Sequence, residues 1–319
     1  MTKITNDFID QNFSPADFLA NCRRVFLMLG EEKVAVTPRE EKVDNSGRFT
    51  LRMPGKIGKL SGYKLIEELP PPEPGKLGQR TAVIRLMLED GTEVELDAEH
   101  ITNMRTGAAG VLGMEFLAPR AKNIAILGTG KIAKALALCA IEFGVDTINV
   151  FSRKPENRQK FKEHLVKHLV FDKVVLHDSI PSCVSDVEAI LTAVPTPEPV
   201  LFFRDLPPRV HISVMGGDSR TAQLDSEILK KGVVIPDNLQ QCQRSGEFKL
   251  ALKRGYFDEI NFAQIDGRIA HIGDAALGKI NPDKPITITY FTGLAIQDLH
   301  AAQMVYEKFT KTPSLADIR

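Results

Sequence analysis

A short apolar run that breaks into Gly-x-Gly-x-x-Ala constrains the fold of this 319-residue chain more than any other feature. The segment from 124 to 133 reads Ile-Ala-Ile-Leu-Gly-Thr-Gly-Lys-Ile-Ala, which is typical of a buried strand that turns sharply into a helix. Gly128 can adopt the tight turn, Gly130 has no side chain to keep the backbone away from a phosphate, and Ala133 lets the helix lie close to the strand. Because a helix N-terminus attracts anions, the pattern predicts a dinucleotide pyrophosphate site. The alternative is that the glycines only shape a turn.

The residues that follow strengthen the first interpretation and indicate which dinucleotide binds. A helix is expected from Lys131 to Phe143, and a second apolar run, Thr147–Phe151, lies roughly 20 residues beyond the glycines. An NAD site usually places an acid at the end of this second strand, whereas this chain has Ser152, Arg153 and Lys154. A hydroxyl and two cations suit a 2′-phosphate, so NADP(H) is favoured and NAD(H) remains possible. A solvated basic loop is the alternative interpretation of the same residues.

Alternation of strands and helices from 122 to about 235 predicts a doubly wound parallel sheet. The expected strands are 124–127, 148–151, 173–176, 189–191, 211–214 and 233–235, with one more at 286–291. Further cofactor contacts are expected within the glycine turn and at the ends of later strands, from Thr129, Lys131, Ile132, Thr192, Ala193, Val194 and Met215.

The first third of the chain has a different pattern. Ser14 is expected to cap a helix that runs to about Leu29, and short strands follow at 49–53, 62–66, 81–88 and 93–96. Asp90-Gly91 predicts a hairpin, and the proline-rich segment 69–75 predicts a stiff loop. A helix over 100–117 closes this part before Pro119, and an amphipathic helix over 295–309 is expected to pack back on it.

Composition excludes several function classes. Lysine plus arginine equals aspartate plus glutamate at 41 each, so charge gives no reason to expect a nucleic acid or an anionic membrane as partner. The four cysteines are scattered without the paired spacing of a zinc site or a disulfide framework, and no metal is expected. The N-terminus does not resemble a signal peptide and no stretch is long enough to span a membrane, so we expect a cytoplasmic protein.

Several charged residues stand in otherwise apolar surroundings. Lys64 lies inside an expected strand and Arg105 inside a helix of small residues, where a guanidinium usually has an anion to bind. Arg39 and Arg52 flank expected strands, and Asp218 follows the strand 211–214 by way of two glycines, at the edge where open α/β sheets bind ligands. The plainer alternatives are a solvated edge lysine, surface arginines and an aspartate that caps the next helix. Together the cations suggest a substrate carboxylate, and the acid suggests proton transfer at an amine or imine, whose iminium form accepts hydride most readily.

These segments, in this order, resemble the ornithine cyclodeaminase/mu-crystallin family across nearly the whole chain. The matching stretches are Met53-Pro54, Gly62-Tyr-Lys64, Ile101-Thr-Asn-Met-Arg-Thr-Gly-Ala-Ala109, Ile126-Leu-Gly-Thr-Gly130, Gly216-Gly-Asp218, Ser245-Gly-Glu247 and Gly293-Leu-Ala-Ile-Gln-Asp298. The resemblance implies an α/β fold in which a Rossmann domain, 119–290, is inserted in an α+β substrate-binding and dimerisation domain formed by 1–118 and the C-terminal helix within 291–319. It also implies a homodimer.

The resemblance further implies roles for individual residues. Arg39, Lys64 and Arg105 would hold the carboxylate of an amino or imino acid, and Asp218 would handle the proton at its nitrogen. Lys64 is also expected to take part in catalysis. Thr106 would help to bind the cofactor phosphates, and Arg52 and Thr81 complete the expected substrate-binding set.

This chain departs from the cyclodeaminase pattern in several places, three of which bear on the substrate and the cofactor. Arg52 stands where cyclodeaminases have the acid of Glu-Leu-Met-Pro, no lysine follows Asp218 in Ser219-Arg-Thr-Ala222, and the second strand does not end in an acid. The first departure favours a substrate with a second anionic group. We therefore expect an NADP(H)-dependent reductase of a ketimine, pyrroline-carboxylate or similar imino acid, reversible as an amino-acid dehydrogenase. An ornithine or lysine cyclodeaminase that uses NAD catalytically, and a mu-crystallin-like NADPH-dependent ligand-binding protein, are the alternatives.

Overall fold

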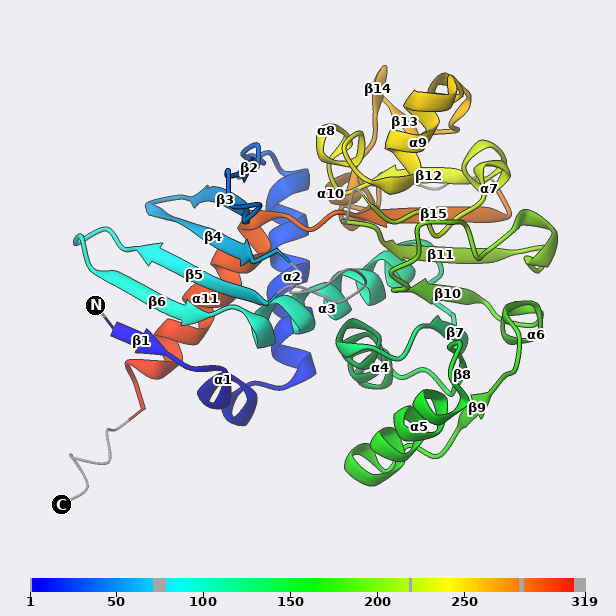
Figure 1. The fold of residues 1–319 in the computed structure, drawn as a ribbon, viewed down its shortest axis with the longest axis horizontal. Coiled ribbons are helices and arrows are strands. Elements are labelled where there is room, and N and C mark those ends of the chain that lie inside the picture. Colours follow the sequence, from blue (N-terminus) through cyan, green and yellow to red (C-terminus); the bar gives the residue numbers. More distant parts are fainter. Residues whose placement is uncertain (1, 71–78, 218–219, 281–283, 313–319) are drawn as a thin grey trace. The chain divides into compact units, whose positions relative to one another are not determined.

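Two sheets organise the chain, each in a unit of its own (Figure 1). The computed structural model describes residues 2–70, 79–217, 220–280 and 284–312. Unit 1 comprises residues 1–105 and 294–319, and unit 2 comprises residues 106–293. The long helix α3, Glu99–Leu117, begins in the first unit and continues into the second.

Unit 1 is built on a six-stranded sheet in the order β1-β6-β5-β4-β3-β2. Neighbouring strands are antiparallel except for β1 and β6, which are parallel. Pro54 is tolerated inside β3 because β2 pairs only with the first part of that strand, up to Arg52. The strands are β1 Thr2–Ile4, β2 Glu40–Val43, β3 Phe49–Ile57, β4 Leu60–Glu68, β5 Arg80–Met87 and β6 Glu93–Asp97.

Helices cover one face of this sheet. Helix α2, Pro15–Gly30, begins at Ser14 in a capping box with Asp17, as its sequence predicts. Helix α11, Ala295–Phe309, packs on β3, β4, β5 and α2. The sheet admits this helix closely because a Cβ atom at Gly55 or Gly62 would lie 2.8 or 3.1 Å from the side chain of Leu299. The short helix α1 spans Asn6–Asn12.

Unit 2 contains a seven-stranded, all-parallel sheet in the order β12-β15-β11-β10-β7-β8-β9. The strand order reverses between β7 and β10, which is the point where sheets of this kind bind dinucleotides. The strands are β7 Asn123–Leu127, β8 Thr147–Phe151, β9 Val174–Leu176, β10 Ala189–Thr192, β11 Val210–Met215, β12 Val233–Pro236 and β15 Ile286–Phe291. A separate two-stranded hairpin joins β13 Gln264–Ile265 and β14 Arg268–Ile269.

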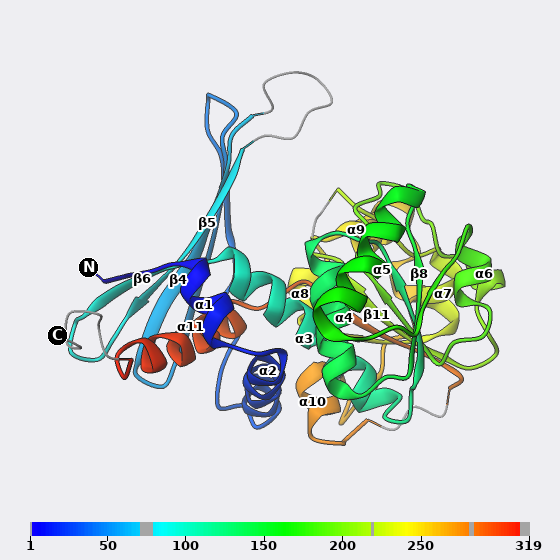
Figure 2. The same cartoon turned by 90° about the horizontal axis from the view of Figure 1, so that it is seen from below.

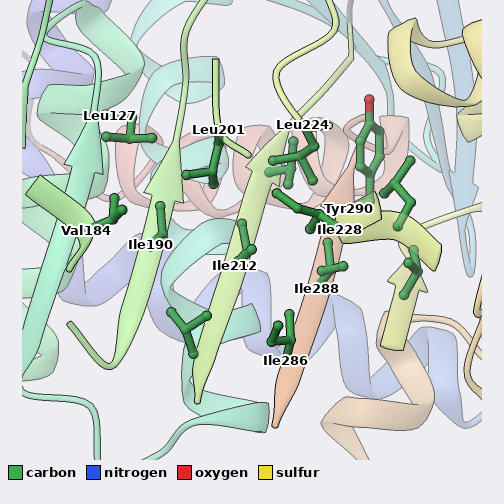
Figure 3. Packing of buried hydrophobic residues seen from close by; sticks show 14 of the residues in the cluster. Leu127, Val184, Ile190, Leu201, Ile212, Leu224, Ile228, Ile286, Ile288 and Tyr290 are labelled. Atoms are coloured by element: carbon green, nitrogen blue, oxygen red, sulfur yellow. The ribbon is translucent and has the colours of Figure 1, made fainter. Parts of the chain in front are cut away.

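Both faces of the parallel sheet are covered by helices (Figure 2). On one face, side chains of β10, β11 and β15 form an apolar core with the helices α6 (Ile180–Val184), α7 (Ser226–Lys231) and α9 (Gly246–Arg254) (Figure 3). On the other face, α3 lies close to the sheet because Gly110 and Gly113 place no side chain against Met215 and Phe291. The helices of this unit are α4 Lys131–Phe143, α5 Pro155–Leu169, α6 Ile180–Val184, α7 Ser226–Lys231, α8 Leu239–Cys242, α9 Gly246–Arg254 and α10 Ile272–Ala276, with 3₁₀ turns at Phe203–Asp205 and Phe257–Glu259.

The predicted fold class, a doubly wound Rossmann sheet in an α/β chain, is confirmed. The observed division of the chain differs from the expected boundary after residue 118, because the glycines of α3 pack within unit 2 and carry residues 106–117 with them. The sequence pattern did not reveal β1 and β2. Most of the proline-rich loop expected at 69–75 lies outside the described residues. None of the helices in the described ranges combines the length and apolarity needed to span a bilayer.

Candidate functional site

Unit 1 contains a buried cluster of three charged side chains from three different elements. Lys64 on β4, Arg105 on α3 and Asp298 on α11 are 1%, 7% and 0% exposed. Lys64 Nζ and Arg105 Nε both donate to Asp298 Oδ1, each at 3.0 Å. Two cations thus surround one acid, and the buried cluster carries an excess positive charge when all three groups are ionised. Because an unpaired buried charge costs several kcal/mol, this arrangement is suited to an anionic ligand.

Strand register and helix packing place these groups together. Lys64 pairs with Met53 on β3 and with Ile84 on β5, and both neighbours are buried. Its side chain is therefore on the face of the sheet that α11 covers. Leu299 of α11 fits against the glycines of β3 and β4, and the preceding residue, Asp298, reaches Lys64. The Gly62-Tyr-Lys64 spacing thus supplies both the close approach of the helix and the cation beneath it.

Donors and an acceptor remain in the cluster for a ligand. A lysine ammonium has three N–H groups and a guanidinium has five, and Asp298 Oδ1 takes one from each. Asp298 Oδ2 is buried and accepts no hydrogen bond from any side chain that the structure describes. A ligand with both a carboxylate and an N–H group would match these atoms.

Burial shifts the proton affinity of the cluster. Burial lowers the pKa of Lys64 to about 8. The negative charge of Asp298 acts to raise this pKa, and the positive charge of Arg105 lowers it further. Burial alone would raise the pKa of Asp298, but the nearby charges of Arg105 and Lys64 outweigh it, and the pKa lies below its usual value. Asp298 is consequently a carboxylate at neutral pH, whereas Lys64 can lose its proton in mildly alkaline solution.

A second layer of contacts supports the cluster. Gln297 Nε2 donates to the sulfur of Cys22 at 3.2 Å, and this sulfur lies 4.0 Å from the main-chain oxygen of Arg105. Burial raises the pKa of the Cys22 thiol to about 12, so it remains a neutral thiol that packs α2 against α3 and α11. The other three cysteines are also free and buried, as expected of core residues. No group of metal-ligating side chains occurs among the described residues.

The structure does not bring every expected substrate residue to this cluster. Met53 and Ile84, the partners of Lys64 in the sheet, share its face. Arg52 is one residue from Met53 and Thr81 is three residues from Ile84, so strand alternation places both side chains on the opposite face. There Arg52 forms an ion pair with Glu40 at 3.0 Å. Arg39 is half-buried, and continuing the β2–β3 register by one residue would place it on the face of Met53 and Lys64.

The glycine turn of unit 2 has the geometry that a pyrophosphate site needs. Gly128 has a φ of +112°, and a Cβ atom there would lie 2.8 Å from the main-chain oxygen of Ala193. A Cβ atom at Gly130 would meet no atom of the described residues within 4 Å, so these residues leave the space in front of it open. Gly130 is the N-cap of α4, and no side chain caps this end of the helix. These features fit a dinucleotide phosphate on the main-chain N–H groups at the start of α4.

The other expected residues of the turn have different environments. Thr129 and Ile132 are half-buried, and Lys131 is exposed at the start of α4. Thr106 is half-buried at the first position of unit 2, next to Gly107, where a Cβ atom would lie 2.5 Å from the backbone of Ala135 in α4.

The carboxyl end of β8 lies beside this turn. The N–H of Gly128 donates to the oxygen of Phe151 at 2.9 Å, which joins the turn to the last residue of β8. Ser152 is half-buried, and the exposed Arg153 and Lys154 follow it. Neither cation forms an ion pair with another described residue. The predicted basic residues thus stand at the place where the second strand of such a sheet meets the adenosine ribose.

At the ends of β10 and β11, the residues expected to contact the cofactor form hydrogen bonds within the protein. The hydroxyl of Thr192 donates to Gln223 Oε1 at 2.8 Å, and its side chain is fully buried. The N–H of Val194 donates to the same oxygen, and the oxygen of Met215 accepts from Gln223 Nε2. Ala193 donates its N–H to Leu127, so it is linked to the glycine turn.

Sequence reasoning missed Asp298, the acid at the centre of the cluster. The stretch Gly293-Leu-Ala-Ile-Gln-Asp298 was one of the matching motifs, and this was the signal that could have pointed to a role for it. The expected proton carrier, Asp218, lies outside the described residues.

Comparison with known proteins adds to this geometry. The model of the ornithine cyclodeaminase/mu-crystallin family matches residues 18–313. Alanine dehydrogenase from Archaeoglobus fulgidus is 30% identical over 216 residues, which are 66% of this chain and 65% of that enzyme. Delta(1)-pyrroline-2-carboxylate reductase from Bacillus thuringiensis is 27% identical over 257 residues, 77% of each chain.

A solved structure has the same fold. It is that of Thermococcus litoralis Delta(1)-pyrroline-2-carboxylate reductase in complex with NADH and L-proline, with a TM-score of 0.84 and 23% identity over 98% of each chain. Both curated relatives are named as a dehydrogenase or a reductase of an amino or imino acid, so the expected class of enzyme, an oxidoreductase that acts on such compounds, is confirmed at the level of the family.

Proposed function

This chain belongs to the ornithine cyclodeaminase/mu-crystallin family, and we propose that it is an NADP(H)-dependent reductase of an imino acid, reversible as an amino-acid dehydrogenase. The substrate would be a ketimine, a pyrroline-carboxylate or a similar compound. The buried cluster of Lys64, Arg105 and Asp298, with its excess positive charge, is the observation that carries the proposal.

The cluster would bind the substrate carboxylate. Lys64 and Arg105 each retain N–H donors after their bonds to Asp298, and the two cations approach the same acid from β4 and α3. A charge-assisted hydrogen bond to a buried carboxylate contributes about 1.5–3 kcal/mol. Arg39 is a third candidate for this role, because the β2–β3 register, continued by one residue, would bring it to the same face.

The dinucleotide would be held by unit 2. Main-chain N–H groups at the start of α4, in front of the open space at Gly130, would bind the pyrophosphate, and Ser152, Arg153 and Lys154 would bind a 2′-phosphate. Thr106 is expected to assist with the phosphates. When bound, the cofactor supplies a hydride to the carbon of a protonated C=N group.

Proton transfer would be the task of two residues. Asp218 is expected to hold and release the proton of the substrate nitrogen. Lys64 has a pKa of about 8, so near neutral pH it can exchange a proton within the site, and it combines this capacity with binding of the acid group. Asp298 Oδ2 retains capacity to accept a hydrogen bond from an N–H group.

Arg52 bears on the choice of substrate. Its side chain is on the face of the sheet opposite to Lys64 and is paired with Glu40, so within this unit it adds no further cation to Lys64 and Arg105. We therefore propose a substrate with a single carboxylate rather than the second anionic group that the sequence alone favoured.

A screen of imino substrates tests the proposed function. NADPH oxidation is followed by absorbance with amine and 2-oxo acid mixtures and with preformed cyclic imines, and NADH is tested in parallel. Consumption of NADPH by one of these imines supports the proposal. Release of ammonia from ornithine or lysine without net change in reduced cofactor would instead identify a cyclodeaminase. Tight NADPH binding without any turnover would identify a ligand-binding protein. Light scattering of the same preparation tests the expected homodimer.

A further inference from the structure

One buried amide joins the ends of two strands in unit 2. Gln223 is 1% exposed, and its side chain makes three hydrogen bonds. Its Oε1 accepts from the hydroxyl of Thr192 and from the N–H of Val194, each at 2.8 Å, and its Nε2 donates to the oxygen of Met215 at 2.9 Å. Thr192 ends β10 and Met215 ends β11, so a single side chain fixes the carboxyl ends of these neighbouring strands.

A buried acid fixes the main chain on which this amide is carried. Glu247 in α9 is 1% exposed, and its Oε1 accepts from the N–H groups of Gln223 at 2.6 Å and Leu224 at 3.2 Å. Its Oε2 accepts from the hydroxyl of Tyr290, which also lies 3.3 Å from the oxygen of Gly216. The acid thereby holds the segment around Gln223 in place against α9 and β15, and in Figure 3 the ring of Tyr290 lies beside the apolar core of this sheet.

These contacts continue to the glycine turn. Val194, whose N–H bonds to Gln223, follows Ala193, whose N–H donates to the oxygen of Leu127 at 3.0 Å. The oxygen of Ala193 is the atom that excludes a Cβ at Gly128. The Gln223 amide is therefore connected, through Val194 and then Ala193, to the main-chain atoms that shape the glycine turn. These atoms lie at the carboxyl ends of β7 and β10, where the strand order reverses.

We propose that Gln223, held by Glu247, is a positioning residue for the nicotinamide nucleotide. This inference rests on the proposed function. In a doubly wound sheet the strands β7, β8 and β9 form the half that binds adenosine, and β10 and β11 belong to the half that binds the second nucleotide. Gln223 sets the spacing of the ends of β10 and β11, and with it the position of the main chain at Ala193 and Val194. It does not itself touch the cofactor.

Replacement of Gln223 by Glu gives a test in which pH decides whether the side chain can donate a hydrogen bond. A protonated glutamic acid accepts with one oxygen and donates with the other, so it can reproduce all three bonds of the amide. An ionised carboxylate cannot donate to the oxygen of Met215 and would face it as a second acceptor. Gln223→Glu should therefore bind oxidised dinucleotide within about twofold of wild type near pH 5, and about tenfold or more weakly near pH 8.

The titratable group that contacts this position is Glu247, whose pKa burial raises, and Tyr290 is bonded to it in turn. Measuring wild type by calorimetry at the same pH values removes their contribution. Asn149→Asp is the matched control, because the Asn149 amide is buried in the same sheet and donates to the oxygen of Ile124 at 3.1 Å, in the middle of β8. The titratable neighbour of Asn149 is His177, whose Nε2 lies 2.8 Å from Asn149 Oδ1 and whose pKa burial lowers. The substitution changes the same chemical group away from the ends of β10 and β11, so its dinucleotide affinity relative to wild type should not fall between pH 5 and pH 8 as that of Gln223→Glu does.

The outcomes are distinct. A pH-dependent loss of affinity in Gln223→Glu alone supports the positioning role. Equal affinity of Gln223→Glu and wild type near pH 8 refutes it, and so does an equal loss in Asn149→Asp, which would indicate a general effect of burying an acid. If wild type binds neither NADP⁺ nor NAD⁺, the proposed function fails, and the inference fails with it. Should Gln223→Glu not fold near pH 8, the neutral Gln223→Met decides: unchanged dinucleotide affinity there overturns the role, and a loss of about tenfold supports it.

Discussion

Replacement of Lys64 by Met should weaken the affinity for a carboxylate and remove its dependence on pH. The Lys64 ammonium is bonded to Asp298 at 3.0 Å and retains two N–H donors. Loss of one charge-assisted bond costs about 1.5–3 kcal/mol, so the inhibition constant of a carboxylic acid should rise by about tenfold to a hundredfold near pH 7.

The pH dependence of wild type follows from the same group. Because the pKa of Lys64 is about 8, roughly nine-tenths of the side chains are charged near pH 7 and about one-tenth near pH 9. The wild-type inhibition constant should therefore rise by about tenfold over this interval, with affinity lost as the pH increases. Lys64→Met should show a weak inhibition constant that stays flat over the same range.

The assay needs an acid whose own charge does not change. Cyclopentanecarboxylate, which has no nitrogen, serves as a competitive inhibitor of the reductase reaction, and each variant is measured near pH 7, 8 and 9. Lys59→Met is the matched control, because Lys59 is an exposed lysine of the same unit that is ion-paired with Glu89 at the surface. It should leave the inhibition constant at its wild-type value.

Two results would contradict this reasoning. If Lys64→Met binds the acid as tightly as wild type, the ammonium does not hold the carboxylate, and the cluster is a structural ion pair. If Lys64→Met binds weakly but wild type shows no change between about pH 7 and 9, Lys64 binds the acid but burial has not lowered its pKa as far as the structure indicates.

Three further predictions concern the cofactor and the proton. Gly130→Val should destabilise the fold by about 1 kcal/mol or less yet abolish dinucleotide binding, whereas Gly128→Ala should cost about 1–3 kcal/mol of stability. Thermal unfolding measures the change in stability, and calorimetry measures dinucleotide binding. If Gly130→Val still binds the dinucleotide, the glycine turn is not part of the binding site. Arg153→Glu combined with Lys154→Glu should lower the preference for NADPH over NADH by at least about tenfold in kcat/KM, and an unchanged ratio would show that these cations are solvated. Asp218→Asn should reduce kcat by about two to four orders of magnitude with unchanged cofactor affinity, and undiminished turnover would exclude Asp218 from proton transfer.

The sequence was most informative where the determinants are local. The glycine turn, the helix after it and the basic residues after β8 lie within one short stretch, and their residue types follow from backbone geometry and phosphate charge. Ser14 likewise predicted the start of α2, where its capping box with Asp17 joins residues only three positions apart. Strands β1 and β2 escaped prediction because β1 has three residues and β2 is exposed along its whole length, so neither shows a hydrophobic period.

The site required information that no local pattern contains. Lys64 and Asp298 are 234 positions apart, and only the packing of α11 on β4 brings them together. Arg52 was expected at the substrate because it replaces an acid in a family motif, but the face that a strand residue occupies depends on register, and register places Met53 rather than Arg52 beside Lys64. The role inferred for Gln223 depends in the same way on contacts with two strands that precede it in the chain.

The charge count of the cluster explains why it combines one acid with two cations. Without Asp298, Lys64 and Arg105 would be buried with no countercharge, and desolvation would drive the lysine to release its proton. With a second acid the cluster would be neutral, and a substrate carboxylate would meet repulsion from two anions rather than one. A single acid holds Lys64 and Arg105 at 3.0 Å each and still leaves the attraction that a carboxylate needs. The same balance leaves the pKa of Lys64 near 8, so the proton that helps to bind the acid is also one that the site can release near neutral pH.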